Sequence, residues 1–577
     1  MRRYIGVLVA AAVIVVAVTI LGMMLYKDYQ DKHKPSDVVM PLAQYYSLSA
    51  DEGLIIIDET VYEKKAAWRN GTAYLDLNTV LEMYDNRFFW VGQENTLFYS
   101  MADVVYRFTP GEKRFLANRE PMEQDKPVVE LVGGLPYIRI DFLERCGITY
   151  RLYSDPNRVM ITYSDEPYLT TKAKEATQIR MGKDIKESIL KEVAEGENLR
   201  FIDGGGVREN GFIKVMSDDG VRGYIKESAL AESGYTDPSF MPYTEPAFVP
   251  TLMSGPVYLG WQLLYTKDNV GYLESALKNA DEVNVVSPTW FFLTGTDGEM
   301  VSYANREYVE KAHDNGVSVW ALYKNDTIEG QFSGTEDSHR VLSNTQARTA
   351  LIDNIMAGVA EYGIDGVNID FEMLKVDSGP YFIQFLRELS IECRRKGIIL
   401  SVDNYVPENY NVYYNLSEQS YFVDYIIIMG YDEHYNGSEE AGSVSSLSWF
   451  KRAVENTAAM ADASRVIMGV PFYTRLWKTE GGKAVVAATP GMAETPEAVK
   501  KAGASAEWSD AAGQNYAEWK SGNALYQIWI EDEESLTEKT KAAKEAGMAG
   551  IAAWKLGDEK AGTWTVIADT FEGRTAE

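Results

Sequence analysis

Beyond Pro256, short apolar runs alternate with longer segments in which apolar residues recur at helical spacing. Short apolar runs between turn residues are typical of buried strands, and recurrence every three or four residues is typical of amphipathic helices. The helical segments include 305–315, 345–362, 381–396 and 536–546. The strand-like runs are 257–261, 282–286, 317–322, 366–371, 398–402, 425–429, 466–470 and 550–554. Strands that alternate with helices in this way predict an α/β fold, a (β/α)8 TIM barrel with insertions, over residues 256–571.

An open, doubly wound sheet is the alternative arrangement for such a pattern. That fold normally carries a glycine-rich turn that binds phosphate after its first strand. This sequence has no such turn. We therefore favour the closed barrel.

The N-terminus carries an uncharged apolar run over residues 5–25, between Arg2 and Arg3 on one side and Lys27 on the other. A helix of this length spans a bilayer core of ~30 Å. A cleaved signal peptide, the alternative, has a shorter apolar region and a small-residue exit site. We expect residues 1–28 to form a cytoplasmic tail and a transmembrane anchor. This prediction places the chain in the cell membrane as a single-pass protein with its bulk outside the cell.

A weak internal repeat follows over residues 48–166. The segment 70–77 is similar to 133–140, and 97–99 is similar to 160–162 at the same offset. Each copy predicts a strand, a short helix and two more strands. The region resembles the stalk-type module at the N-terminus of copper amine oxidases. The resemblance implies an α+β spacer or wall contact, and it implies no copper.

Short strands separated by glycines follow over residues 170–233. The clearest are 179–182, 211–215 and 223–228. They resemble a bacterial SH3-type module, a small β-barrel, and this resemblance implies a possible wall peptide as ligand. A packing barrel without a ligand is the alternative. Four prolines between positions 238 and 250 then predict a semi-rigid linker over 234–255.

Composition narrows the range of partners. The chain has 577 residues, and its formal net charge of −29 argues against nucleic acid as a partner, because phosphates would be repelled. Cys146 and Cys393 are too few for a disulfide framework. The four histidines have no paired spacing typical of a zinc site. We expect no metal ion and no cofactor.

Acidic residues concentrate in one predicted strand, over residues 363–372. Period-two alternation puts Asn368, Asp370 and Glu372 on one face, and the residues between them are apolar. A half-exposed antiparallel strand is one interpretation of this alternation. Like charges on one face of such a strand repel each other, however, and this cost argues against a purely structural role. Two neighbouring carboxyls suit glycoside hydrolysis, in which a carboxyl with a raised pKa donates a proton. In a barrel, Glu372 would lie at the C-terminal end of its strand, where active sites occur.

The pattern Asp365-Gly366-x-Asn368-x-Asp370-x-Glu372 resembles the signature of glycoside hydrolase family 18, the chitinase-like family. Two further matches are the sixth-strand motif 429–432 and the tryptophan that ends the eighth strand, Trp554. The segment 429–434, with Gly442, Ser443 and Trp449 after it, resembles the bacterial branch of spore-cortex-lytic N-acetylglucosaminidases more than it resembles the secreted chitinases.

The resemblance implies a retaining mechanism in which the substrate's own N-acetyl group is the nucleophile. Glu372 would then donate and accept the proton, Asp370 would hold the acetamido N–H, and Tyr431 would bind the acetamido oxygen. Plain glucans are excluded, because they carry no 2-acetamido group.

Asn368 departs from the commoner chitinase pattern, which has aspartate there. An aspartate can share a proton with its neighbour, whereas Asn368 can only form a hydrogen bond, so we expect Asp370 to ionise more readily.

Other candidates for sugar binding are Trp554, Trp261 and Trp290, with core packing as the alternative for each. Asp432 and Arg475 are candidates for contacts with sugar hydroxyls, and Tyr473 is a candidate groove residue. Asp365 is expected to support the strand.

Two classes of function follow from these patterns. The first is an anchored hydrolase of β-linked N-acetylglucosamine glycans, with peptidoglycan favoured over chitin or chitooligosaccharides because the chain carries an anchor and wall-type modules. The second is a catalytically idle protein that binds cell wall or glycan. The presence of Glu372, Asp370 and Tyr431 together favours the hydrolase.

Overall fold

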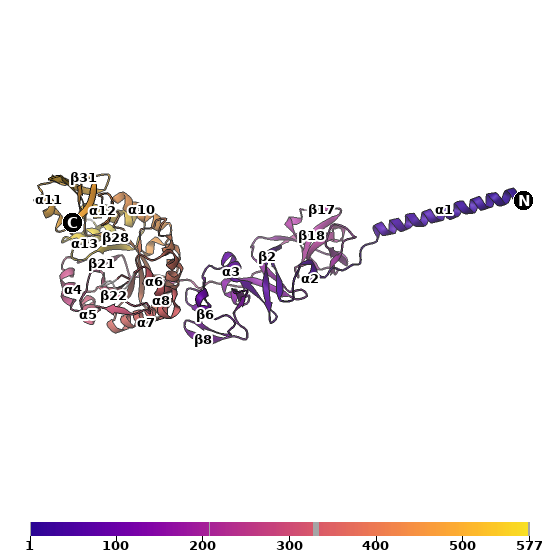
Figure 1. The fold of residues 1–577 in the computed structure, drawn as a ribbon, viewed down its shortest axis with the longest axis horizontal. Coiled ribbons are helices and arrows are strands. Elements are labelled where there is room, and N and C mark those ends of the chain that lie inside the picture. Colours follow the sequence, from indigo (N-terminus) through magenta and orange to yellow (C-terminus); the bar gives the residue numbers. More distant parts are fainter. Residues whose placement is uncertain (1, 207, 327–333, 575–577) are drawn as a thin grey trace. The chain divides into compact units, whose positions relative to one another are not determined.

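The computed structural model describes residues 2–206, 208–326 and 334–574 (Figure 1). The chain divides into two compact units. One holds residues 1–98, 107–116 and 120–245, and the other holds 99–106, 117–119 and 246–577. The second unit contains the predicted barrel.

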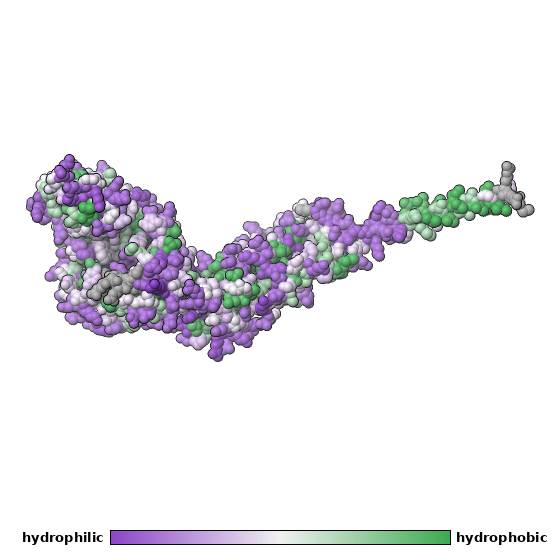
Figure 2. Space-filling view, viewed as in Figure 1, coloured by the Kyte–Doolittle hydropathy of each residue, from purple (hydrophilic) through white to green (hydrophobic). Residues whose placement is uncertain are grey.

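Helix α1 spans Arg2–His33 and contains the apolar run. It is long and apolar enough to cross a membrane. Hydrophobic residues cover it over most of its length, and its described side chains are exposed (Figure 2). A membrane anchor and a signal sequence share these properties.

The repeat region folds into strands with short helices between them. Its elements are α2 (Leu42–Tyr45), β1 (Glu52–Ile57), β2 (Thr60–Arg69), β3 (Thr72–Asp76), α3 (Leu77–Met83), β4 (Phe88–Val91), η1 (Gly92–Glu94), β5 (Thr96–Ser100), β6 (Val105–Phe108), β7 (Arg114–Ala117), β8 (Glu120–Glu123), β9 (Val129–Val132), β10 (Leu135–Arg139), η2 (Phe142–Cys146), β11 (Thr149–Tyr153) and β12 (Arg158–Thr162). One sheet has the order β11-β12-β1-β2-β3-β10-β9, and another has the order β4-β5-β6-β7-β8. The first strands of the two repeats, β3 and β10, pair antiparallel with each other.

A third sheet, whose strands pair antiparallel, follows in the order β15-β14-β19-β18-β16-β13-β20, with β17 paired to β18. Its elements are β13 (Tyr168–Lys172), β14 (Thr177–Arg180), β15 (Ile189–Val193), β16 (Asn198–Phe201), η3 (Asp203–Gly205), β17 (Arg208–Glu209), β18 (Phe212–Ser217), β19 (Arg222–Lys226), η4 (Glu227–Ala229) and β20 (Gly234–Thr236). The three strands that we predicted here correspond to β14, β18 and β19. The predicted linker begins with β20, which pairs with β13.

Eight parallel strands form a closed barrel in the order β21-β34-β28-β27-β26-β25-β24-β22, because β22 also pairs with β21. The strands are β21 (Val257–Gln262), β22 (Val285–Leu293), β24 (Ser318–Lys324), β25 (Gly366–Asp370), β26 (Ile399–Tyr405), β27 (Tyr425–Met429), β28 (Val466–Pro471) and β34 (Gly550–Trp554), and β23 (Met300–Ser302) adds a hairpin to β22. All eight predicted runs overlap these strands. The second strand begins three residues later than we predicted.

Helices cover the outside of the barrel (Figure 1). The helices of this unit include α4 (Val270–Leu277), α5 (Arg306–Asp314), α6 (Glu336–Ser343), α7 (Thr345–Tyr362), η5 (Val376–Ser378), α8 (Gly379–Lys396), η6 (Val412–Tyr414), α9 (Leu416–Gln419), α10 (Leu447–Ala458), η7 (Ala463–Arg465), α12 (Glu533–Glu545) and α13 (Thr563–Glu572). Helix α7 shows how the sequence ends an element. The Asn344 side chain accepts a hydrogen bond from the Ala347 N–H at its start, and Gly363 adopts the left-handed conformation at its end.

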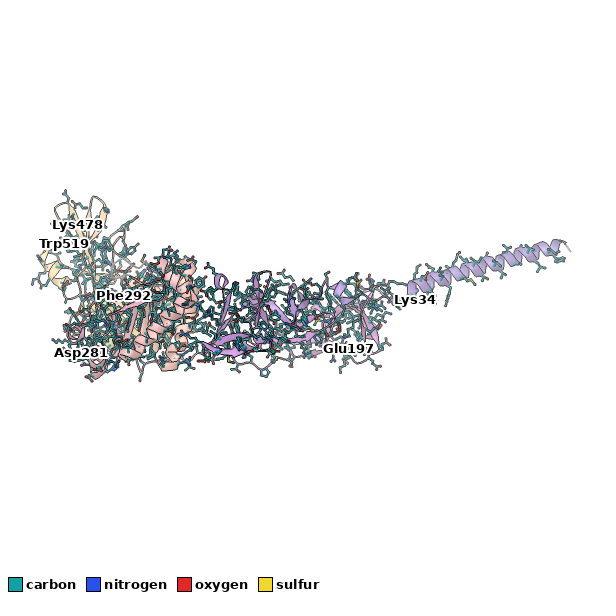
Figure 3. The ribbon with its side chains drawn as sticks, turned by 60° about the horizontal axis from the view of Figure 1, so that its bottom comes forward. Lys34, Glu197, Asp281, Phe292, Lys478 and Trp519 are labelled. Carbon is teal, nitrogen blue, oxygen red and sulfur yellow. The ribbon has the colours of Figure 1, made fainter. Side chains whose placement is uncertain are left out.

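An inserted sheet separates β28 from β34, with the strand order β30-β29-β33-β32-β31. Its elements are β29 (Leu476–Glu480), β30 (Lys483–Ala488), α11 (Thr495–Lys501), β31 (Glu507–Ser509), β32 (Gln514–Ser521) and β33 (Ala524–Ile530). Lys478 and Trp519 mark this sheet in Figure 3. The sequence patterns predict an insertion somewhere in the barrel, but they do not locate it.

Candidate active site

Strand β25 carries the acidic motif, and its two faces differ as we predicted. Val367, Ile369 and Phe371 belong to the core that the barrel shares with its helices. Asn368 and Asp370 lie on the opposite face, and both are buried. The interior of the barrel is lined by a separate apolar cluster that includes Trp261.

Asn368 is the centre of a buried hydrogen-bond network. Its Oδ1 accepts from the Trp261 indole N–H at 3.1 Å and from the Ser287 hydroxyl at 2.9 Å. Its Nδ2 donates to Asp403 Oδ1 at 2.8 Å. Asn368 is fully buried, so these bonds fix both the amide and its three partners.

Asp370 lies beside a cation, the ammonium of Lys324. The Lys324 ammonium is 3.7 Å from Asp370 Oδ2 and 3.1 Å from Asp326 Oδ2. Burial, and then the nearby Glu372 carboxylate, raise the pKa of Asp370 to about 7, although Lys324 opposes this rise. Burial acts to lower the pKa of Lys324, but the neighbouring carboxylates outweigh it and raise that pKa. Lys324 is therefore charged near neutral pH, and Asp370 is close to its titration point.

Glu372 follows the last residue of β25 and is half-buried, so its carboxyl remains accessible. Asn325 holds its backbone from both sides. Asn325 Oδ1 accepts from the Glu372 N–H at 2.8 Å, and Asn325 Nδ2 donates to the Glu372 carbonyl at 2.8 Å. Tyr405 lies on the other side, where burial and then the Glu372 carboxylate raise its pKa. The proton-donor candidate thus has a fixed backbone and a phenol beside its side chain.

Tyr431 follows β27 and joins this group from the opposite side. Its ring centroid lies 6.3 Å from that of Trp261 and 6.4 Å from that of Tyr473. Burial, then Tyr473, raise its pKa well above the usual value, and the carboxylates of the site add to the rise. The Tyr431 phenol therefore keeps its proton and is able to donate a hydrogen bond.

Trp554 ends β34, as the eighth-strand prediction required, and its ring lies 6.2 Å from that of Trp261. Trp554 is half-buried, whereas Trp261 is only 1% exposed. The half-exposed Trp554 ring is thus available to a ligand in a way that Trp261 is not. Trp261 acts through its hydrogen bond to Asn368.

Asp432, Tyr473 and Arg475 form a small polar group at the rim. Asp432 Oδ1 accepts from the Tyr473 hydroxyl at 2.6 Å and from Arg475 Nη2 at 2.6 Å. Asp432 adopts the left-handed conformation, with φ of 64°. Arg475 also donates from Nε to the His434 carbonyl at 3.2 Å. The three predicted residues lie together, and Asp432 is exposed.

Trp290 and Asp365 lie elsewhere. Trp290 is completely buried in the outer core, where its ring packs edge-on against Tyr308 at 4.8 Å. Sugar stacking by Trp290 is therefore wrong, and the packing alternative holds. Asp365 accepts hydrogen bonds from the Val319 N–H and from His313, so it supports the start of the strand.

Sequence reasoning missed four residues of this group: Lys324, Asn325, Asp403 and Tyr405. Lys324 and Tyr405 end their strands, and Asp403 lies on the inner face of β26. Period-two alternation from the apolar residues of β26 would have put Asp403 and Tyr405 on the lumen face. No local signal marks Asn325, because its role depends on β25 lying beside β24.

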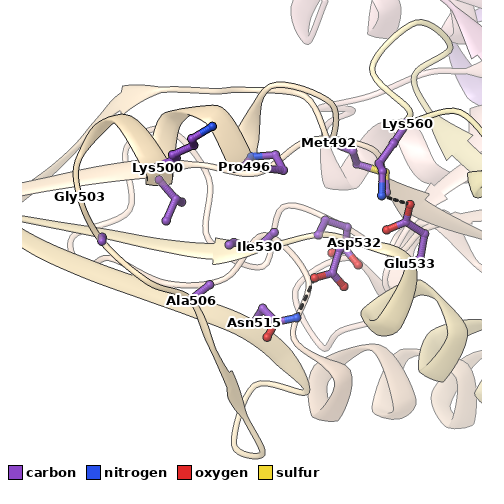
Figure 4. Close-up of a pocket in the computed structure, with 13 residues that line it drawn as sticks. Met492, Pro496, Lys500, Gly503, Ala506, Asn515, Ile530, Asp532, Glu533 and Lys560 are labelled. Atoms are coloured by element: carbon purple, nitrogen blue, oxygen red, sulfur yellow. Dashed lines mark hydrogen bonds and ion pairs between the residues drawn. The ribbon is translucent and has the colours of Figure 1, made fainter.

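A cavity of about 690 Å³ lies away from these residues (Figure 4). Its lining includes Pro496 of α11, Ile530 of β33 and Glu533 of α12, together with Met492 and Lys560 from the loops beside them. Lys560 and Glu533, which both line this cavity, form an ion pair at 2.8 Å. None of the predicted site residues lines it.

Residues 328–559 match the model of the glycosyl hydrolases family 18. This part of the chain is therefore similar to a family 18 glycosidase domain. The chain is 25% identical over 321 residues to the uncharacterized glycosylase YvbX of Bacillus subtilis. This match covers 53% of the chain and 90% of YvbX. It is 24% identical over 264 residues to the cortical fragment-lytic enzyme of the same organism, covering 42% of this chain and 58% of that enzyme. The C-terminal domain of a putative chitinase from Desulfitobacterium hafniense has the same fold, with a TM-score of 0.50 and 22% identity over 55% of this chain and all of that domain.

Proposed function

We propose that this chain is a membrane-anchored glycoside hydrolase that cleaves β-linked glycans containing N-acetylglucosamine. One arrangement carries the proposal: the accessible Glu372 carboxyl, the buried Asp370 carboxyl and the Tyr431 phenol interact electrostatically at the barrel end where the parallel strands terminate. This group contains a proton donor, a carboxyl near its titration point and a hydrogen-bond donor. Substrate-assisted hydrolysis requires these three.

The proposed mechanism is retaining. Glu372 donates its proton to the glycosidic oxygen, and the bond to the anomeric carbon breaks. The substrate's N-acetyl oxygen bonds to that carbon and forms an oxazolinium ion, while Asp370 accepts the acetamido N–H and Tyr431 donates to the acetamido oxygen. Glu372 then takes a proton from the water that opens the oxazolinium ring. The enzyme thereby returns to its starting state.

Sugar binding is assigned to the residues around this group. The half-exposed Trp554 ring offers a stacking face to the pyranose. Asp432 and Arg475, joined by their 2.6 Å contact, are proposed to bind sugar hydroxyls at the rim. Asn368 and Trp261 support the floor through their mutual hydrogen bond.

Peptidoglycan is the substrate that we favour, with chitin or chitooligosaccharides as the alternative. The similarity to a cortical fragment-lytic enzyme supports this choice. A surface position supports it as well, and we propose that α1 anchors the chain with the remainder outside the cell. The region 170–233 is then available for a wall peptide.

The proposed anchor is tested by washing membrane fractions of cells that make the full chain at alkaline pH. The membranes should retain the protein, whereas its release would contradict an anchor.

The central experiment measures new reducing ends from purified peptidoglycan and, in parallel, from chitin. Glu372→Gln keeps the size of the side chain but loses the proton, so turnover should fall by about 100-fold or more. The matched control is Glu310→Gln, the same change at an exposed position on α5. Equal release by the wild type and Glu372→Gln would leave only the alternative of an idle glycan-binding protein.

A second experiment tests the substrate-assisted step separately. A thiazoline that mimics the oxazolinium ion should inhibit the wild type, because the site is proposed to bind that ion. Full turnover at saturating thiazoline would refute this step while leaving hydrolysis itself in place.

A further inference from the structure

Three neighbouring strands present charged side chains at one level inside the barrel. Lys324 on β24 is the register partner of Asp370 on β25. Ile369 on β25 is the register partner of Val402 on β26, so the next step along both strands sets Asp370 beside Asp403. Ile369 and Val402 face the helices, and alternation therefore turns Asp370 and Asp403 inward. The resulting row is an ammonium, a carboxyl and a second carboxyl.

Both carboxyls are buried, with Asp370 5% exposed and Asp403 3% exposed. Lys324 is the nearby cation, and it is shared with Asp326. Two carboxylates side by side in a buried site cannot both ionise at low cost, so one proton stays with the pair. The pair therefore titrates as a unit.

The hydrogen bonds indicate which carboxyl holds that proton. Asp403 Oδ1 accepts from Asn368 Nδ2, and the amide oxygen of Asn368 is already used by Trp261 and Ser287. Asp370 Oδ1 is buried and has no hydrogen-bond partner among the residues that the structure describes. A proton on the second oxygen of Asp403 would supply the donor that Asp370 Oδ1 lacks. Asn368 does not supply this hydrogen bond, because its Nδ2 donates to Asp403.

We infer that Asp403 is a protonated carboxylic acid near neutral pH, that it donates a hydrogen bond to Asp370, and that it is a positioning residue for the proposed hydrolysis. The proton stays on Asp403 and is shared with Asp370 only through this hydrogen bond. Asp370 then stays ionised and held in place while it binds the acetamido group. The expected effect on turnover rests on the proposed function, whereas the protonation of Asp403 does not depend on that function.

The titratable surroundings agree with this assignment. Burial, and then the Asp370 carboxylate, raise the pKa of Asp403 well above its usual value, although the bond from Asn368 opposes the rise. The titratable and charged groups that face the pair are Lys324 and Asp326 from β24 and its following loop, Glu372 from the end of β25, Tyr405 from β26 and Tyr431 from the end of β27.

The first test detects the proton directly, in the full chain purified in detergent. Infrared spectra near neutral pH should show the carbonyl band of a buried carboxylic acid, and Asp403→Asn should remove it. Asp365→Asn, which changes a carboxyl at the other end of β25, should leave the band. A wild-type spectrum without such a band, or a band that survives in Asp403→Asn, would overturn the inference. A band that behaves as expected in a protein that hydrolyses no glycan supports the proton and contradicts only the proposed function.

The second test uses the pH profile of kcat. The Asp403→Asn amide can donate to Asp370 but cannot lose a proton, so kcat near neutral pH should stay within about tenfold and the fall at alkaline pH should shift upward or vanish. Asp403→Ala removes the donor and should lower kcat by about 100-fold, the scale on which misplacement of a catalytic group acts. The double variant Asn368→Asp with Asp403→Asn moves the acid to β25 and should restore an alkaline fall. If Asp403→Asn keeps the wild-type alkaline limb, the positioning role is wrong.

Discussion

The Lys324 ammonium and the Asp370 carboxylate lie 3.7 Å apart on neighbouring parallel strands at the mouth of the barrel. Asp370 has a pKa of about 7, so small changes in its surroundings decide whether it is charged at neutral pH. Lys324 is 12% exposed, and its charge is therefore weakly screened by solvent. The balance of charge in the site depends on this contact.

Lys324→Met tests that balance. Loss of the ammonium should raise the pKa of Asp370 further, so more of it would be protonated at neutral pH. Because Lys324 opposes the rise in the wild type, kcat should fall by about tenfold or more near neutral pH and recover partly at alkaline pH. The pH profile of kcat measures this shift. Lys278→Met, at an exposed position after α4, is the control, and an unchanged acid limb in Lys324→Met would contradict the proposed coupling.

Asn325 provides a separate prediction about the position of Glu372. Asn325→Ala removes both hydrogen bonds to the Glu372 backbone and one to the Ser338 hydroxyl. Asn325 is 1% exposed, so the groups left behind are buried without partners, at about 1–3 kcal/mol each. We expect lower stability in urea unfolding and a kcat lowered by about 100-fold, with KM changed much less. A wild-type kcat in a folded Asn325→Ala variant would show that this contact does not position Glu372.

The sequence predicted the barrel well because strand order and strand face depend on local patterns. The motif on β25 was correctly divided between the interior and the helices, since polar and apolar residues alternate strictly there. Trp290 was a candidate for sugar stacking because it lies near a strand end. Ser287 on the same strand bonds to Asn368 inside the barrel, whereas Trp290 belongs to the outer core. Asp403 and Lys324 escaped notice for another reason. Their importance arises from the register between strands that are distant in sequence.

The inserted sheet carries a buried ion pair that should control its stability. Lys539 on α12 lies 2.6 Å from Glu531, and their side chains are 0% and 1% exposed. Burial lowers the pKa of Lys539 and raises that of Glu531, so each charge depends on the other. Lys539→Met should lower the free energy of unfolding by about 3–5 kcal/mol. Adding Glu531→Gln should restore part of that loss.

Lys541→Met is the matched control for this pair, because Lys541 is exposed on the same helix. Urea unfolding of the single and double variants gives the coupling free energy between the two positions. Equal stability of Lys539→Met and Lys541→Met would mean that the buried pair contributes little.

The pH dependence of stability tests Asp403 without any substrate. The pKa of Asp403 is raised in the folded chain, so its proton binds more tightly there than in the unfolded chain. A carboxyl with a raised folded pKa contributes stability that is fully present below its unfolded pKa of about 4 and is lost as the pH rises toward the folded value. Asp403→Asn has no carboxyl proton to lose, so this pH-dependent loss of stability is absent from the variant.

The difference in melting temperature between Asp403→Asn and the wild type should therefore move in favour of the variant between about pH 4 and pH 7. Thermal unfolding of both proteins across this range measures it, and Asp281→Asn, the same change at an exposed position, is the matched control. A difference that stays constant with pH would show that Asp403 carries an ordinary pKa. Since only a group that exchanges its proton on folding changes the slope of stability with pH, the slope separates a shared proton from a merely well-packed aspartate.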